Sequence, residues 1–283
     1  TYLLRDENGK DTAIFSGDTL FLGDVGRPDL AQKAAHMTQE ELAGLLYESL
    51  MNKRGYDSID DVMKKGLTAM NPAQFEQAAE LSGALILDTR TADEFSKGFV
   101  PQSINIGIKG DFAPWVGALI GDVKQELLLV TEPGMEEETV TRLARVGFDH
   151  VIGFLDGGID AWKKAGKEID TVKRISPEQF SQEFKAKESM VVDVRRESEY
   201  AAQHVDEAYN KPLAYINEWI NAIDPHQHFF LHCAGGYRSM IAASLLQARG
   251  YRNFSEVSGG FNAIAKTEVP TTDFVCQSKL MTA

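Results

Sequence analysis

Short apolar runs alternate with amphipathic segments over most of the chain. The runs Leu85–Leu87, Leu127–Val130, Met190–Val192 and Phe229–Leu231 are uniformly apolar and are bounded by polar or turn residues. Strands of this kind are typical of a mostly parallel sheet that helices cover on both faces. Because the segments between them place apolar residues at helical spacing, the pattern predicts an α/β fold.

The pattern occurs twice. Asn71–Phe75 returns as Ser176–Phe180, and each copy has an N-cap residue, a proline at the first helical position and a glutamine two residues later. Leu85–Arg90 returns as Met190–Arg195. Matching positions are 105 residues apart early in the unit and 102 residues apart late in it. We therefore expect two homologous α/β units with mostly parallel sheets, each of about a hundred residues.

These units divide the chain into three expected segments, residues 1–66, 67–170 and 171–283. The first segment opens with a hairpin signal, because Asn8 and Gly9 separate the runs Tyr2–Leu4 and Thr12–Ser16. A capped helix over residues 38–50 and a short helix over residues 58–63 are expected to follow. One hairpin and one helix cannot bury a core. We therefore expect residues 1–66 to be the C-terminal part of a larger domain plus a connector.

Composition and charge narrow the choice of partners and compartment. The chain has 283 residues, with 29 Lys and Arg against 42 Asp and Glu, and a net charge of −13. This acidic balance disfavours nucleic acid and anionic membranes as partners. Two cysteines, Cys233 and Cys276, cannot form a disulfide framework, so we expect a reducing compartment, the cytoplasm. No apolar run approaches the ~20 residues of a membrane span.

The segment His232–Ser239 has the strongest chemical signal in the chain. Cys233 follows an apolar strand, and glycines separate it from a segment with helical spacing that ends at Gly250. A glycine-rich loop at a helix N-terminus directs backbone N–H groups and partial positive charge towards the cysteine. Both favour the thiolate, which is the reactive form. Arg238 adds a fixed cation at the end of the loop.

This spacing resembles the active loop of the rhodanese (sulfurtransferase) family, in which Cys-x-x-Gly-x-Arg-Ser/Thr holds a cysteine persulfide. The matching residues are Cys233, Gly236, Arg238 and Ser239. The resemblance implies that Cys233 is the nucleophile and forms a persulfide. It also implies that the persulfide is bound by Ala234, Gly235, Gly236, Tyr237, Arg238 and Ser239. Phosphatase and arsenate reductase relatives have one more residue between Cys and Arg, so the spacing disfavours those activities.

The first repeat lacks this chemistry. At the corresponding place, Thr131–Glu138 contains neither cysteine nor arginine and carries four glutamates. Negative charge there would repel an anionic sulfur intermediate, so we expect this repeat to be catalytically silent and to serve structure or docking. We also expect the pairs Asp88 with Arg90 and Asp193 with Arg195 to fix loops rather than bind substrate.

Three other histidines are expected to be structural. His204 is expected to be a packed side chain, because Gln203 stands where the family has glycine before histidine. His226 and His228 lie where a turn leads into a strand, and no carboxylate follows at ligand spacing.

Phe15–Leu20 together with Gly26–Asp29 resembles the metallo-β-lactamase fold, in particular its persulfide dioxygenase branch. The resemblance implies that Asp18 is a ligand of a mononuclear Fe(II), with two histidine ligands in segments absent from this sequence. Such a site leaves open positions for O2 and substrate.

The whole chain resembles persulfide dioxygenase–rhodanese fusion proteins of bacterial sulfide detoxification. The expected partners are small-molecule sulfur donors and thiol acceptors, and a homo-oligomer stays open. Two alternatives also stay open: a glyoxalase II-like metallo-hydrolase with rhodanese domains, which would need two metals, and a non-enzymatic sulfur-carrier or docking module.

Overall fold

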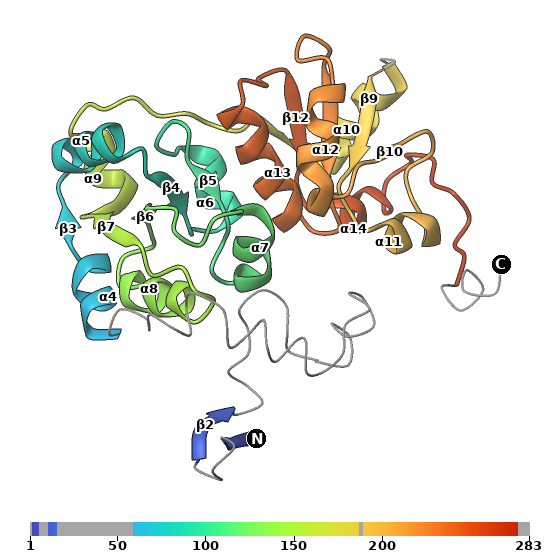
Figure 1. Cartoon of the computed structure of the whole chain (residues 1–283). Coiled ribbons are helices and arrows are strands. Elements are labelled where there is room, and N and C mark those ends of the chain that lie inside the picture. The colour runs from blue at the N-terminus through green and yellow to red at the C-terminus, as the bar shows by residue number, and fades with distance from the viewer. Residues whose placement is uncertain (1, 6–10, 16–58, 187–188, 277–283) are drawn as a thin grey trace.

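The computed structural model describes residues 2–5, 11–15, 59–186 and 189–276 (Figure 1). Strands β1 (Tyr2–Arg5) and β2 (Asp11–Phe15) pair antiparallel, with Leu3 opposite Ile14, and confirm the hairpin. Asp18 and the helix expected over residues 38–50 lie outside the described residues.

The first repeat contains a five-stranded parallel sheet in the order β3-β7-β6-β4-β5. Its elements are α4 (Ile59–Gly66), β3 (Ala69–Met70), α5 (Pro72–Ser82), β4 (Leu85–Asp88), α6 (Ala92–Lys97), β5 (Ile104–Asn105), α7 (Phe112–Leu119), β6 (Leu127–Val130), α8 (Glu136–Ala144), β7 (Val151–Leu155) and α9 (Gly158–Lys164). Helix α4, expected in a connector, packs on this repeat, since Val62 is buried in its core.

The second repeat has the same topology, with strand order β8-β12-β11-β9-β10. Its elements are β8 (Arg174–Ile175), α10 (Pro177–Ala186), β9 (Met190–Asp193), α11 (Glu197–Ala202), β10 (Tyr209–Asn210), η1 (Leu213–Tyr215), α12 (Ile216–Trp219), η2 (Ile220–Ala222), β11 (Phe229–His232), α13 (Tyr237–Ala248), β12 (Phe254–Val257) and α14 (Gly260–Ile264). The spacing between the repeats changes where η1, α12 and η2 replace α7. The doubled α/β pattern of the sequence is therefore confirmed.

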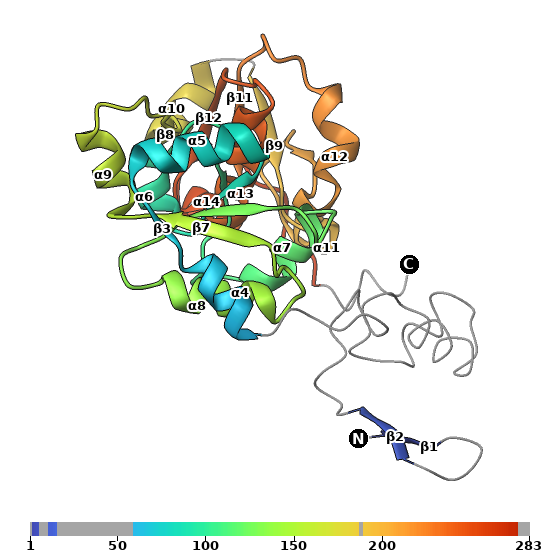
Figure 2. The same cartoon turned by 60° about the vertical axis from the view of Figure 1, so that its left-hand side comes forward.

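Side chains of the central strands alternate between two cores. In β6, Leu128 and Val130 face the core beneath α5 and α9, whereas Leu127 and Leu129 face the core beneath α4, α7 and α8. Figure 2 shows α5 on one side of the first sheet and α4 with α8 on the other. Because both faces are covered, every residue of β6 is buried, and this is why the run carries no polar residue.

Helix starts follow the sequence signals. Asn71 accepts hydrogen bonds from the backbone N–H groups of Ala73 and Gln74, and the Gln74 side chain accepts from the Asn71 N–H, which completes a capping box. Gly83 ends α5 in the left-handed conformation, with φ 66°.

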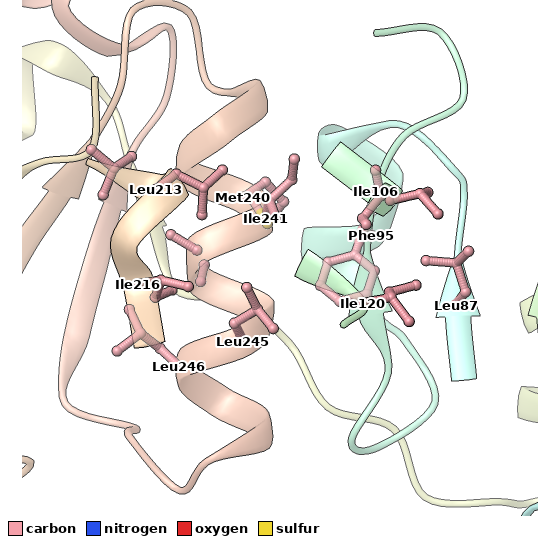
Figure 3. Packing of buried hydrophobic residues seen from close by; sticks show 14 of the residues in the cluster. Leu87, Phe95, Ile106, Ile120, Leu213, Ile216, Met240, Ile241, Leu245 and Leu246 are labelled. Atoms are coloured by element: carbon pink, nitrogen blue, oxygen red, sulfur yellow. The ribbon is translucent and has the colours of Figure 1, made fainter. Parts of the chain in front are cut away.

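The two repeats are joined through α13. The N–H of Asn105, on the edge strand β5, donates to Ser244 Oγ of α13 at 2.9 Å, and that hydroxyl donates to the Ile241 carbonyl. One apolar cluster runs from the first repeat into α13, and Figure 3 shows Met240 and Ile241 on the side of α13 that faces Ile106. An edge strand with unpaired backbone groups invites association, so α13 closes the edge of the first sheet.

No helix in the described part of the chain is long and apolar enough to cross a membrane.

Ser244→Ala is expected to lower the free energy of unfolding by about 1–3 kcal/mol, because the buried Asn105 N–H loses its acceptor. Urea unfolding measures the change. Ser82→Ala, at an exposed helix end, is the control and is expected to stay within about 0.5 kcal/mol of the wild type. An equal loss in the two variants would contradict this role of Ser244.

Candidate active site around Cys233

Cys233 lies at the carboxyl end of β11, in the centre of the second sheet. The loop after it turns at Gly236, whose φ is 101°, and α13 begins at the next residue. Only glycine adopts this φ without strain. Cys233 is 1% exposed, so its side chain is buried at the base of this loop.

Two polar groups lie next to the sulfur atom. The backbone N–H of Gly236 donates to Cys233 Sγ at 3.1 Å, and Ser239 Oγ lies 3.4 Å from it. The N-terminus of α13 adds its partial positive charge at the same place. Of the loop residues expected to bind a persulfide, Gly236 and Ser239 therefore contact Sγ directly.

The loop backbone is held from below by α14. The N–H groups of Phe261 and Asn262 donate to the carbonyls of Cys233 and Ala234 at 2.7 Å and 3.0 Å. A Cβ at Gly260 would lie 2.4 Å from the Cys233 carbonyl oxygen, so this position requires glycine. At the matching Gly158 of the first repeat a Cβ would lie 3.5 Å from the Thr131 carbonyl oxygen, so the requirement there comes from the positive φ of 58°.

Arg238 is engaged by a carboxylate. Its guanidinium makes two hydrogen bonds to Glu199 of α11, at 2.5 Å and 2.8 Å. These hydrogen bonds hold the pKa of Glu199 below its usual value. The cation expected from the sequence is present, but Glu199 partly balances its charge, and the sequence analysis did not identify Glu199.

A second carboxylate near the sulfur was also missed. Glu256, on β12, is fully buried and accepts a hydrogen bond from Ser239 Oγ at 2.6 Å. A signal in the sequence could have identified it: Glu256 is an acidic residue inside the short strand segment Phe254–Val257, which is buried throughout. A buried carboxylate requires hydrogen-bond or charged partners, so such a residue points to an interaction.

Tyr237 connects the loop to the first repeat. Its hydroxyl donates to the Gly107 carbonyl at 2.8 Å, and burial raises its pKa. A Cβ at Gly110 would lie 2.3 Å from the Tyr237 ring, so the ring occupies space that only glycine leaves open. The first repeat thus helps to position the active loop of the second.

The first repeat keeps the loop shape without its chemistry. Thr131 follows β6 as Cys233 follows β11, and Gly134, three residues on, has φ 86° where Gly236 has 101°. Glu136 stands at the position of Arg238 and accepts a hydrogen bond from Thr131 Oγ1 at 3.1 Å. Residues 131–138 include neither a cysteine nor an arginine, and the catalytic silence of this repeat stays a prediction.

The Asp-x-Arg pairs fix loops in both repeats, as expected. Arg195 hydrogen-bonds both carboxylate oxygens of Asp193 and also the carbonyl of Gln203. Arg90 does the same with Asp88 and the carbonyl of Gly98. Gly98 of the first repeat corresponds to Gln203 of the second. The backbone is extended at both positions, with φ of 162° and −169°, so the second repeat accommodates glutamine there without backbone strain.

Three histidines in the described part of the chain are buried or packed against neighbouring residues. His204 stacks on Tyr200 with ring centroids 3.7 Å apart, so it is packed as expected. His232 is fully buried and burial lowers its pKa, which keeps it neutral. His228 packs against Phe230 and contacts Ser255. Within the described ranges, no group of three or more His, Cys, Asp or Glu side chains could hold a metal ion.

Comparison with known proteins identifies the family. A family model described as a rhodanese-like domain matches residues 71–165 and again residues 176–267. The chain belongs to the rhodanese-like family. The two matches coincide with the two repeats, so the tandem rhodanese architecture expected from the sequence is confirmed.

Individual relatives cover parts of the chain. Thiosulfate sulfurtransferase GlpE of Pseudomonas fluorescens (strain SBW25) is 33% identical over 89 residues, which are 31% of this chain and 81% of that protein. tRNA uridine(34) hydroxylase of Leptospira interrogans is 28% identical over 100 residues, and the chain spans 27% of it. The putative sulfur carrier protein YrkF of Bacillus subtilis is 26% identical over 97 residues, and the chain spans 52% of its length.

A solved structure of a thiosulfate sulfurtransferase from Pseudomonas aeruginosa matches 74% of this chain and 44% of its own, at 18% identity and a TM-score of 0.33. The family match, together with the relatives named thiosulfate sulfurtransferase, supports a rhodanese-like sulfurtransferase activity. These matches lie within the two repeats or do not test the first segment, so the metallo-β-lactamase fusion stays a prediction.

Arg238→Ala is expected to raise the pH at which Cys233 is alkylated at half its maximal rate by roughly 0.5–1 unit, because a cation near the sulfur is lost. Glu199→Gln is expected to lower that pH, because it removes the charge that balances Arg238. The rate of iodoacetamide labelling at the Cys233 peptide measures both. Unchanged profiles in both variants would mean that the loop backbone alone sets the reactivity.

Proposed function

We propose that this chain is a sulfurtransferase that moves sulfane sulfur through a persulfide on Cys233. The observation that supports this most directly is Cys233 Sγ beneath the Gly236 N–H and beside Ser239, at the N-terminus of α13. The donors would be small molecules such as thiosulfate or a persulfide, and the acceptors thiols. Among the described residues, Cys233 and Cys276 form no disulfide, and we propose a reducing compartment, the cytoplasm, for the protein.

The reaction has two displacements. In the first, Cys233 Sγ attacks the outer sulfur of the donor, a sulfur–sulfur bond forms on the enzyme, and the bond within the donor breaks. With thiosulfate, sulfite leaves with the electron pair. In the second, an acceptor thiolate attacks the outer sulfur of the persulfide, and Cys233 leaves as the thiolate.

The loop stabilises the anionic stages of both displacements. The Gly236 N–H points at Sγ before sulfur is loaded, so no reorganisation is needed when charge develops there. Arg238 supplies positive charge at the end of the loop, moderated by Glu199. The first repeat takes no part in bond making in this proposal and acts through Tyr237 and the packing of α13.

Cys233→Ser is expected to abolish thiosulfate:cyanide sulfur transfer, because serine cannot carry the sulfane sulfur. Cys276→Ser, which alters an exposed thiol, is the matched control and is expected to keep most of the activity. Activity that survives in the Cys233 variant would overturn the assignment. A persulfide that forms on Cys233 without turnover would favour the non-enzymatic sulfur carrier instead.

For the part of residues 1–66 that precedes α4, we propose membership of a metallo-β-lactamase-like persulfide dioxygenase domain. The support is the resemblance of Phe15–Leu20 and Gly26–Asp29, in which Asp18 would be one ligand of a mononuclear Fe(II). Bound iron would supply O2 activation for oxidation of a thiol persulfide to sulfite. Asp18 lies outside the described residues, so this part of the proposal rests on the sequence resemblance alone.

A protein that joins this chain to the histidine-bearing part of such a domain is expected to bind about one iron, and Asp18→Ala is expected to remove it, because three ligands are needed on one face. Metal analysis of the purified protein measures this. The 283-residue chain by itself is expected to hold no metal at Asp18. Two metals per chain would favour the glyoxalase II-like hydrolase.

A further inference from the structure

Glu256 is a buried carboxylate directly behind the active cysteine. One of its oxygens, Oε1, accepts from Ser239 Oγ at 2.6 Å, and the other, Oε2, accepts from Arg174 Nε at 2.7 Å. Arg174, on β8, also pairs with Asp93 of the first repeat. Ser239 Oγ in turn lies 3.4 Å from Cys233 Sγ. A continuous polar chain therefore runs from the sulfur to the other repeat.

Ser239 has a single hydroxyl proton to donate. The short distance to Glu256 and the longer one to Cys233 place that proton on the side of the carboxylate. The oxygen then presents a lone pair to the sulfur and accepts the S–H proton. In this state the chain of hydrogen bonds stabilises the thiol of Cys233, in opposition to the Gly236 N–H.

The thiolate needs the opposite arrangement. Ser239 must then donate its proton to Sγ, which deprives an ionised Glu256 of that donor, whereas a protonated Glu256 keeps the hydrogen bond by donating to Ser239. Such a shift needs a carboxylate that can accept a proton, and burial raises the pKa of Glu256, although Arg174 opposes the rise.

Other charged groups lie around the two ends of the chain of hydrogen bonds. The groups that face Glu256 are Arg174 from β8 and Asp93 from α6. Near Cys233 are Arg238 with its partner Glu199, and His232, which burial keeps neutral.

We propose that Glu256 holds the resting Cys233 as a thiol and receives its proton through Ser239 when the cysteine takes up sulfur. The proposal rests on the proposed sulfurtransferase function and adds to it a positioning residue that stores the proton. Ser239 is the link, and Arg174 limits the proton affinity of the carboxylate. Through Arg174, Asp93 of the silent repeat acts on the same equilibrium.

The step balances without a further reactant. With thiosulfate, the Cys233 sulfur bonds to the outer sulfur of the donor, and sulfite leaves with the electron pair of the broken bond. The thiol proton passes to Ser239 Oγ while the hydroxyl proton passes to Glu256 Oε1. The products are a persulfide anion, sulfite and a neutral Glu256, so the total charge is unchanged.

Glu256→Gln tests the proposal with little change of shape. Arg174 Nε–H requires an acceptor, so the amide oxygen of Gln faces Arg174 and the amide NH2 faces Ser239. Ser239 then accepts from the amide and must donate to Cys233 Sγ. The variant is therefore expected to form the thiolate at lower pH than the wild type, by about one pH unit or more, since a nearby negative charge is also lost.

Thiolate absorbance in the ultraviolet measures this in a Cys276→Ser background, with Cys233→Ser subtracted. The decisive comparison is a double-mutant cycle with Ser239→Ala. Without the linking hydroxyl, the shift caused by Glu256→Gln is expected to shrink to less than half. Ser255→Ala, which removes a buried hydroxyl from the neighbouring residue on the same strand, is the control and is expected to cause no shift.

If the pH at which half of Cys233 is thiolate is unchanged or raised in Glu256→Gln, the proposal is overturned. An equal shift with and without the Ser239 hydroxyl would overturn it as well, because that result would indicate charge repulsion alone. This readout needs no sulfur transfer, so it is separate from failure of the proposed function, which would appear as no added sulfur on Cys233.

Difference infrared spectroscopy of the wild type does not depend on the folding of any variant. Loading with thiosulfate is expected to produce a protonated-carboxyl band that Cys233→Ser lacks. Sulfur on Cys233 without such a band would also overturn the proposal.

Discussion

The structure depends on one helix that has two tasks. The first turn of α13 forms the end of the active loop, with Gly236 and Tyr237 setting its start. The body of the same helix closes the edge of the first sheet through Ser244 and Asn105. A rigid helix couples its two ends, so the position of the loop over Cys233 depends on how α13 sits on the first repeat. The contact of Tyr237 with Gly107 ties the same helix to that repeat a second time.

The two repeats show that backbone shape and chemistry are separable in this fold. Gly134 and Gly236 turn their loops with nearly the same φ, and both loops follow the central strand of a sheet in the same order. What differs is the side chain on that turn: a threonine paired with a glutamate in one repeat, and a cysteine near an arginine in the other. The balance of charge around the loop, rather than its path, therefore distinguishes the reactive copy.

Much of the fold followed from local patterns. Uniformly apolar strands, capped helix starts and paired glycines are each encoded by neighbouring residues, and the repeat made each signal visible twice. The position of Cys233 also followed, because strand, glycines and arginine are contiguous. Glu199, Glu256 and the Tyr237 contact did not follow, because each joins segments far apart in sequence. Glu256 reaches Ser239 only when β12 lies beside β11, and Tyr237 meets Gly107 only when the repeats dock.

The docking of α13 has a consequence for how such a chain can change over generations. A repeat without chemistry would ordinarily be free to drift or to be deleted. Here, loss of the first repeat would expose Met240 and Ile241 to solvent. Tyr237 would also lose the place that its ring occupies beside Gly110. A Cβ at Gly110 would lie 2.3 Å from the Tyr237 ring and one at Gly107 would lie 3.3 Å from it, so the second repeat restricts which residues these two positions of the first repeat accept. The packing of the second repeat therefore requires the first one, whatever chemistry the loop of the first repeat carries.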